Sequence, residues 1–324
     1  MFTFMLQAFL VVALCPTYSF CNHSPTSLRA NLFFQQPCGD GLAQKLSSEA
    51  RIYCPGSDEF VDSIQRWSTL EAPTFRLTVE VATENDVIEV VKYANEQSIP
   101  FLAVNNAHGA IVTTGKVKRG IMIWMRKLDS IEIAEDGQSA TLGGGILDKA
   151  VTDGLWAAGK QTGIIIIPEV GGVLLTRIVT GGCECVSMIG PGLGGGHGFL
   201  QARHGLISDQ FISLKMVLAD GSLQTINKSH ELWWAVRGAG HNFGVVTSIT
   251  ARIYDIERPR WAFRNFTFTG DKVEALYAGI NEYLLRNGTQ PVDLFHYSIF
   301  TKNPAIDAEK VCPKFGFSPK LANS

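Results

Sequence analysis

Glycine is concentrated in one stretch of this chain, and this concentration limits the possible folds more than any other feature. The glycines fill positions 143–145 and 181–182 and most of the segment 190–198. Glycine permits positive φ angles and exposes backbone N–H groups, so such loops suit the close approach of backbone to a pyrophosphate. Flexible turns between strands explain isolated glycine loops equally well. The neighbouring motifs are therefore needed to distinguish a cofactor-binding loop from flexible turns.

A dinucleotide-binding fold is one alternative. Residues 190–195 satisfy the G-x-G-x-x-G pattern, and Asp220 follows at roughly the distance of a ribose-binding acid. The context does not fit, because Pro191 and the clustered glycines do not open a long helix. Asp220-Gly221 is also typical of a hairpin tip rather than of the end of a parallel strand. The chain has no G-K-[S/T] sequence, which excludes a P-loop.

Length and charge limit the class of protein further. The chain has 324 residues, of which 46% are hydrophobic, enough for two packed domains. The net charge is −2, and the Lys and Arg residues are scattered along the sequence. A nucleic-acid-binding protein needs a concentrated basic surface, so this function is set aside.

The first residues predict export. Residues 1–19 contain an apolar run that is too short to span a bilayer, followed by small residues at cleavage-like spacing, which indicates a signal peptide. No positive charge precedes the run, so a short buried or interfacial segment is the alternative. We expect a secreted, extracellular glycoprotein that is not bound to a membrane after cleavage. Weak support comes from Asn-x-Ser/Thr sequons at Asn22, Asn227, Asn265 and Asn287.

The chain begins its regular structure after an N-terminal segment, residues 20–65. In this segment Cys38 and Cys54 are the natural disulfide pair. A βαβ unit follows, made of the strand RLTVEVA, a helix capped by Thr83 and Asp86, and the strand SIPFLAV. The helix is expected to cover a sheet with Val87, Ile88, Val91 and Ala94.

The later pattern is α+β. Apolar runs broken by Asp-Gly pairs predict hairpins at residues 130–145 and 213–226, and helices are expected at 146–159 and 231–238. A new unit begins after about residue 258, with the strand WAFRNFTF and a helix that runs from Asp271 to Asn287-Gly288. The expected inner face of this helix consists of Val273, Leu276, Tyr277, Ile280 and Leu284.

Five sequence blocks resemble one family in their order along the chain. They are AVNNAHGA, TGGCECVSMIGPGLGGGHG, RHGLISDQ, MVLADG and ELWWAVRGAGHNFGVVTSIT. The same order is typical of fungal FAD-linked oxidases that resemble berberine bridge enzyme and have a vanillyl-alcohol-oxidase-type flavin domain. The resemblance implies an α+β fold with a PCMH-type FAD-binding domain of two α+β subdomains over residues 66–258. A truncated antiparallel-sheet substrate domain over residues 259–324 would follow.

The resemblance also implies covalent FAD. The histidine of the first block, which bonds the flavin 8α-methyl in the family, matches His108, and the cysteine that bonds flavin C6 matches Cys183. A neutral imidazole and a thiolate are suitable nucleophiles for these positions. There are plainer interpretations of these residues: His108 could be an ordinary surface histidine, and Cys183 with Cys185 could be structural or could bind a metal. We expect no metal site. The further cofactor-binding positions predicted are Asn105, Asn106, Ala107, Gly109, Gly144, Thr180, Gly181, Gly182, Gly190, Gly194, Val245 and Val246.

Three features depart from the family pattern. Ala107 stands where many relatives have glycine, so the loop is expected to adopt a conformation that alanine tolerates. Residues 163–178 form an unusual insertion before Cys183, and residues 311–324 resemble nothing in the family. The alternative hypothesis is therefore a truncated or mis-spliced, inactive product that binds FAD poorly or not at all.

In an intact relative the implied reaction is hydride transfer from a substrate C–H to flavin, with O₂ as the acceptor. The substrate would be an alcohol, a sugar lactol or a secondary metabolite. The catalytic base is expected in a C-terminal region that this chain lacks, so no residue is assigned to it. The sequence does not indicate the oligomeric state.

Overall fold

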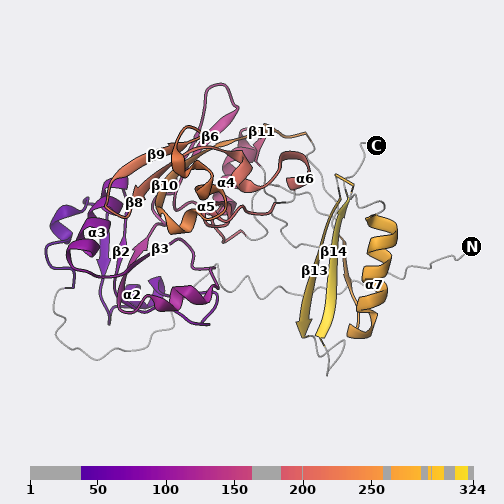
Figure 1. Ribbon diagram of the computed structural model, residues 1–324, viewed down its shortest axis with the longest axis horizontal. Coiled ribbons are helices and arrows are strands. Elements are labelled where there is room, and N and C mark those ends of the chain that lie inside the picture. Colours follow the sequence, from indigo (N-terminus) through magenta and orange to yellow (C-terminus); the bar gives the residue numbers. More distant parts are fainter. Residues whose placement is uncertain are drawn as a thin grey trace, which may run out of the picture. The chain divides into compact units, whose positions relative to one another are not determined.

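The computed structural model describes residues 38–162, 184–198, 200–257, 264–285, 291–292, 294–302 and 311–319 (Figure 1). The expected signal peptide, the 163–178 insertion and residues 180–183 lie outside this range, as do Asn22 and Asn287. The described residues divide into two compact units, one that ends at Ile256 and one that begins at Glu257. Within these residues, no helix is long and apolar enough to cross a membrane.

The first sheet of the larger unit has the order β1-β2-β4-β3. Its strands are β1 (Arg51–Tyr53), β2 (Phe75–Glu80), β3 (Phe101–Val104) and β4 (Gly120–Trp124). Strands β2 and β3 both pair parallel with β4, and β1 pairs antiparallel with β2. The helix α3 (Glu84–Glu96) connects β2 to β3, so the expected βαβ unit is confirmed, with β4 inserted between its two strands.

The sequence of α3 explains its position. Thr83 and Asp86 form the expected capping box at its start. Its apolar face packs against both sheets, because one hydrophobic cluster joins it to strands β2 and β4 and to Val217 and Val245 of the second sheet. The buried residues differ by one from the expectation: Val90 is buried, whereas Ile88 is half-buried at the edge of the cluster.

The second sheet is antiparallel throughout, with the order β5-β6-β10-β8-β9. Its strands are β5 (Ile131–Ile133), β6 (Ser139–Gly143), β8 (Phe211–Leu218), β9 (Leu223–Asn227) and β10 (Gly244–Arg252). Both Asp-Gly pairs form the expected hairpin turns, with φ angles of 63° at Gly137 and 82° at Gly221. Asp220 therefore lies at an exposed hairpin tip, which rules out the dinucleotide-binding alternative.

Apart from α3, the helices of the larger unit have ten residues or fewer. The expected helix at 146–159 is confirmed as α4 (Asp148–Ala157). The helix expected over 231–238 is wrong in type, because this segment forms two 3₁₀ turns, η4 (Glu231–Trp233) and η5 (Ala235–Arg237). The side chain of Trp234 is 80% exposed between them, whereas Ala235 and Val236 are buried. Short 3₁₀ pieces can alternate in this way along eight residues without completing an α-helix.

Several minor elements complete the larger unit. They are η1 (Ala43–Lys45), α2 (Asp58–Ser63), η2 (Val112–Lys116), β7 (Lys160–Gln161), α5 (Ile189–Leu193), α6 (Gln201–His204), η3 (Ile207–Gln210), η6 (Gly240–Asn242) and β11 (Tyr254–Asp255). The glycine-rich run thus opens only the five-residue α5, as expected from Pro191 and its glycine neighbours.

The smaller unit has a three-stranded antiparallel sheet with the order β12-β14-β13. The strands are β12 (Arg264–Thr267), β13 (Leu294–Lys302) and β14 (Val311–Pro319). Residues 311–319, which were expected to resemble nothing in the family, form the central strand, which pairs with both neighbours. The pairing uses backbone hydrogen bonds, which do not require a family-specific sequence.

The predicted helix of the smaller unit is present in two parts. They are α7 (Val273–Gly279), which follows the turn η7 (Gly270–Lys272), and the π-helical η8 (Ile280–Leu284). Of the expected inner face, Ile280 is buried, and Val273, Leu276 and Leu284 are half-buried. Tyr277 is 37% exposed, so its assignment to the inner face is wrong. The expected end at Asn287-Gly288 lies outside the described residues.

The expected disulfide between Cys38 and Cys54 is present, with 5.8 Å between the two Cα atoms. Because it closes a loop across a sequence separation of 16, it restricts the unfolded chain. We expect the double variant Cys38→Ser, Cys54→Ser to lose about 3 kcal/mol of unfolding free energy. Urea unfolding under oxidising conditions measures this loss. Wild-type protein in reducing agent should match the variant, whereas equal stability of oxidised wild type and variant would contradict a stabilising role.

Candidate functional site

The loop that carries His108 begins where β3 ends. The indole Nε1 of Trp124, at the end of β4, donates to the carbonyl oxygen of Asn105 at 3.1 Å. The side-chain amide of Asn105 donates to the carbonyl oxygen of Ile146 at 3.3 Å. Ile146 directly precedes the α4 region, so the loop is tied to the first sheet and to the segment that follows the second sheet's β6.

Asn106 ties the same loop to a third segment. Its side-chain Nδ2 donates to the carbonyl oxygen of Cys185 at 2.7 Å, and its Oδ1 accepts from the Arg126 guanidinium at 2.7 Å. The segment around Cys185 is held in turn by α4, since the Asp148 N–H donates to the Val186 carbonyl at 2.8 Å. The chain just after Cys183 therefore lies against the predicted flavin loop, although Cys183 itself is outside the described part.

Ala107 adopts a left-handed backbone conformation, with φ at 54°. Such a conformation costs a residue with a Cβ roughly 1–2 kcal/mol relative to the right-handed region. Alanine is thus accommodated in this loop, but in a conformation that glycine would adopt without this cost. The backbone N–H of Trp67 donates to the Ala107 carbonyl at 3.2 Å and helps to hold the strained residue in place.

His108 is half-buried, and its ring is stacked on that of Trp67, with 6.4 Å between ring centroids and 20° between planes. Burial lowers the pKa of His108 below its usual 6.5, so the neutral imidazole dominates at physiological pH. On the far side of His108, the Arg66 guanidinium donates to the Gly109 carbonyl at 2.7 Å. The carbonyl oxygens of the residues before and after His108 therefore both accept hydrogen bonds, from the consecutive residues Trp67 and Arg66.

Two buried polar atoms at this loop lack hydrogen-bond partners within the described part of the chain. They are Nε of Arg66 and Oδ1 of Asn105. A buried donor or acceptor without a hydrogen-bond partner lowers the stability of the fold unless a ligand or water forms a hydrogen bond with it. One donor and one acceptor are therefore present for a polar ligand beside His108.

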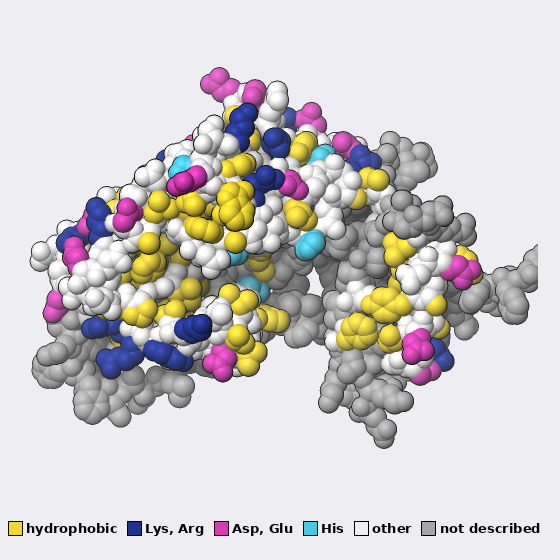
Figure 2. Space-filling model, viewed as in Figure 1, with side chains coloured by type: hydrophobic (Ala, Val, Ile, Leu, Met, Phe, Trp, Pro, Cys, Tyr) yellow, Lys and Arg dark blue, Asp and Glu magenta, His cyan; other side chains and the backbone are white. Residues whose placement is uncertain are grey.

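The surface beside the loop is apolar. Hydrophobic side chains gather on the face of the larger unit that is in view in Figure 2. Exposed large hydrophobic residues in the two segments around His108 are Trp67, Leu70, Ile111 and Val112. Gly109 adds open space, because a Cβ built on it would have no neighbour within 4 Å. An apolar surface with a few polar groups is typical of a cofactor site.

The glycine triplet has a different role from the one first considered. A Cβ on Gly144 would overlap the carbonyl oxygen of Val246, and Gly143 and Gly145 meet backbone carbonyls in the same way. Val245 and Val246 are buried in β10. The structure thus brings the predicted positions Gly144, Val245 and Val246 together by backbone packing, and their contact with a cofactor stays a prediction.

The second glycine run is partly open. A Cβ on Gly190 would have no neighbour within 4 Å, and one on Gly194 would lie 3.7 Å from Cε1 of His241. The backbone then turns back through positive φ at Gly195 and Gly196. Thr180, Gly181, Gly182 and Cys183 lie outside the described residues, so their roles stay predictions.

Four residues at this site carry no sequence motif that predicts a role for them. Arg66 and Trp67 precede the βαβ unit and reach the loop only through the fold, as does Arg126. Asp148 is the fourth, and burial raises the pKa of its carboxyl well above the ordinary range. The sequence shows that Asp148 lies at the start of a predicted helix after the glycine triplet, but it does not show that the side chain is buried.

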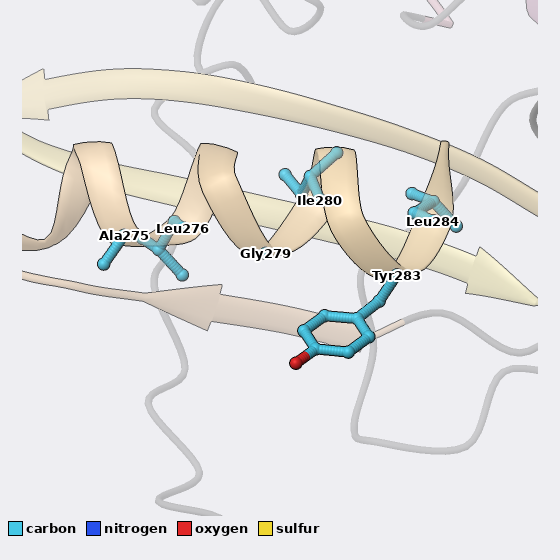
Figure 3. Close-up of a pocket in the computed structure, with 6 residues that line it drawn as sticks. All are labelled: Ala275, Leu276, Gly279, Ile280, Tyr283 and Leu284. Atoms are coloured by element: carbon cyan, nitrogen blue, oxygen red, sulfur yellow. The ribbon is translucent and has the colours of Figure 1, made fainter. Parts of the chain in front are cut away.

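A separate groove lies in the smaller unit (Figure 3). It has a volume of about 360 Å³ and is lined by Ala275, Leu276, Gly279, Ile280, Tyr283 and Leu284. All six residues come from α7 and η8, and five of them are apolar. None carries a charge or a metal-ligating group, so the His108 loop remains the better candidate for chemistry.

Comparison with known proteins identifies the family. A model of the FAD binding domain matches residues 75–189. FAD-linked oxidoreductase chyH of Penicillium rubens is 48% identical over 94% of this chain and 57% of its own length. The chain is a homologue of fungal FAD-linked oxidoreductases. Another homologue, FAD-linked oxidoreductase chry5 of Gibberella zeae, is 49% identical over 82% of this chain and 52% of its own length.

The fold of this chain agrees with solved structures. BBE-like 1 of Physcomitrella patens aligns with a TM-score of 0.68 at 21% identity, over 87% of this chain and 56% of that one. The xylooligosaccharide oxidase of Myceliophthora thermophila also gives 0.68, at 20% identity, over 87% and 55%. The expected α+β fold with a PCMH-type flavin domain is confirmed. The chain spans a little over half the length of these relatives.

The lowered pKa of His108 has a consequence for stability. Because the unfolded chain protonates at about pH 6.5 and the folded chain only at lower pH, His108 costs no stability above this value. Stability should be lost as the pH falls from 6.5 through the folded pKa. NMR titration of the imidazole in flavin-free protein, assigned with His108→Gln, checks the direction. The variant should lose this part of the pH dependence, and a folded pKa at or above 6.5 would contradict the account.

Proposed function

We propose that this chain holds FAD covalently at His108 and, by resemblance, also at Cys183. We further propose that the protein transfers hydride from a small-molecule C–H to the flavin, with O₂ as the acceptor. The observation that carries the proposal is the half-buried imidazole of His108, kept neutral on a loop fixed by three segments of a chain in this flavoprotein family. A neutral imidazole retains the nitrogen lone pair that a bond to the flavin 8α carbon needs.

The residues present fit FAD. The buried Nε of Arg66 can donate to a carbonyl or phosphate oxygen, and the buried Oδ1 of Asn105 can accept from a ring or amide N–H. The open positions at Gly109 and Gly190 leave space where side chains would stand. FAD, when bound, supplies the hydride acceptor. The protein side of the chemistry is attachment at His108, shielding by Trp67 and orientation by Arg66, Asn105 and Asn106.

The substrate class that we propose is broad: an alcohol, a sugar lactol or a secondary metabolite. The solved relatives include a xylooligosaccharide oxidase and a chitooligosaccharide oxidase, but their likeness to this chain is one of fold alone. The FAD-linked oxidoreductases of fungi are much more similar in sequence. No residue of this chain is assigned as the base that removes a substrate proton.

Secretion is a proposal with two supporting observations. The disulfide between Cys38 and Cys54 suits an oxidising compartment. The sequon at Asn227 ends strand β9 with an exposed side chain, as a glycosylation acceptor requires.

Acid precipitation of the purified protein tests flavin attachment. Wild type should give a yellow pellet, since covalent flavin survives denaturation. A variant with both His108→Ala and Cys183→Ala should release all flavin to the supernatant. The matched control His197→Ala changes an exposed histidine within the glycine-rich segment 190–198 and should leave the pellet yellow.

Oxygen consumption with panels of alcohols and sugars then tests the reaction. Production of hydrogen peroxide by the yellow protein supports oxidase function. Wild type that unfolds cooperatively but contains no flavin in either fraction would contradict the proposal and favour the inactive product.

A further inference from the structure

We propose that Arg66 and Trp67 form a clamp that positions the His108 imidazole for its reaction with flavin. This inference rests on the proposed attachment of FAD at His108. The two residues are consecutive, and they follow α2 in a segment that no motif marked as functional.

The clamp grips the backbone on both sides of the histidine. The Trp67 N–H donates to the Ala107 carbonyl at 3.2 Å, and the Arg66 guanidinium donates to the Gly109 carbonyl at 2.7 Å. These two hydrogen bonds fix the peptide group that directly precedes His108 and the peptide group between Gly109 and Ala110, one residue beyond it. They also support Ala107 in its left-handed conformation, which needs support from outside the loop.

The clamp also holds the ring. The indole of Trp67 lies nearly parallel to the imidazole, at 20° and 6.4 Å between centroids. Trp67 is nevertheless 56% exposed, so core packing does not account for a large aromatic residue here. In this proposal the indole limits the rotation of the imidazole and partly covers the face that is turned toward it, which leaves the ring edge and the other face for reaction.

Arg66 suits a second task in the same place. Its guanidinium is half-buried, and burial lowers its pKa, although a guanidinium stays protonated in proteins. One N–H is used for the Gly109 carbonyl, and the buried Nε has no partner within the described part of the chain. This N–H is available to an oxygen of the bound cofactor, so the same residue can orient both reactants.

Positioning matters because the attachment step is demanding. The imidazole N–H and one C–H of the 8α-methyl are replaced by a C–N bond, and two protons and two electrons pass to the flavin ring system. Dioxygen then takes up both protons and both electrons and is released as hydrogen peroxide. Misplacement of a reacting group by about 1 Å can slow such a step by about 100-fold.

The test compares three tryptophan variants in full-length protein made under flavin limitation. FAD is added, samples are stopped in acid, and covalent flavin in the pellet is followed with time. We expect Trp67→Leu, which keeps the backbone N–H, to slow attachment about tenfold or more. Trp67→Phe should retain most of the rate because it keeps a flat ring. Trp234→Leu, the same change at a more exposed tryptophan of the same unit, should match wild type.

A second measurement needs no flavin. Diethyl pyrocarbonate modifies neutral imidazole, and peptide mapping gives the rate at His108. Trp67→Leu should raise this rate by uncovering the ring, whereas Trp234→Leu should not. If wild type never attaches FAD, the proposed function fails and this rate still tests the clamp. Wild-type rates of both reactions in Trp67→Leu would overturn the clamp, as would equal slowing by Trp67→Phe and Trp67→Leu.

Arg66→Met covers the case in which the tryptophan variants fold poorly. It keeps the aliphatic stem but removes the hydrogen bond to Gly109. Slower attachment without a lower unfolding midpoint is expected. Attachment at the wild-type rate would remove Arg66 from the clamp.

Discussion

Backbone packs directly on backbone at Gly143, Gly144 and Gly145, and the arrangement of the larger unit depends on this contact. The N–H groups of Gly144 and Gly145 donate to the carbonyls of Thr247 and Leu128, at 2.7 and 2.8 Å. A side chain at any of the three positions would overlap a carbonyl oxygen. The turn after β4, the end of β6 and strand β10 are therefore held at a separation that only glycine permits.

The candidate site is built on this junction. Ile146 follows the glycines and accepts the hydrogen bond from Asn105, while α4 begins two residues later and holds the segment around Cys185. Asn106 then joins that segment to the His108 loop. The loop that follows the parallel strand β3 is thus fixed by hydrogen bonds on several sides. A residue that reacts with a bound cofactor in one orientation requires such a fixed loop.

Local rules predicted much of the fold. The capping box of Thr83 and Asp86, the Asp-Gly hairpins and the Cys38–Cys54 pair depend on neighbouring residues or on short loops, and all are confirmed. The stack of Trp67 on His108 depends on the whole fold, so no local pattern revealed it. The same holds for the glycine triplet. Three consecutive glycines predicted that backbone approaches something closely, but the sequence did not reveal that this partner is another backbone segment. The roles of Thr180 to Cys183 remain predictions from resemblance.

Tandem mass spectrometry of the peptide that contains His108, prepared from the denatured protein, tests the central claim most directly. The account predicts a flavin-sized mass increment on this peptide, with fragment ions that place it on the His108 side chain, or a cross-linked species that also contains the Cys183 peptide. An unmodified His108 peptide from well-folded protein supplied with FAD would contradict the claim that this loop is a flavin attachment site.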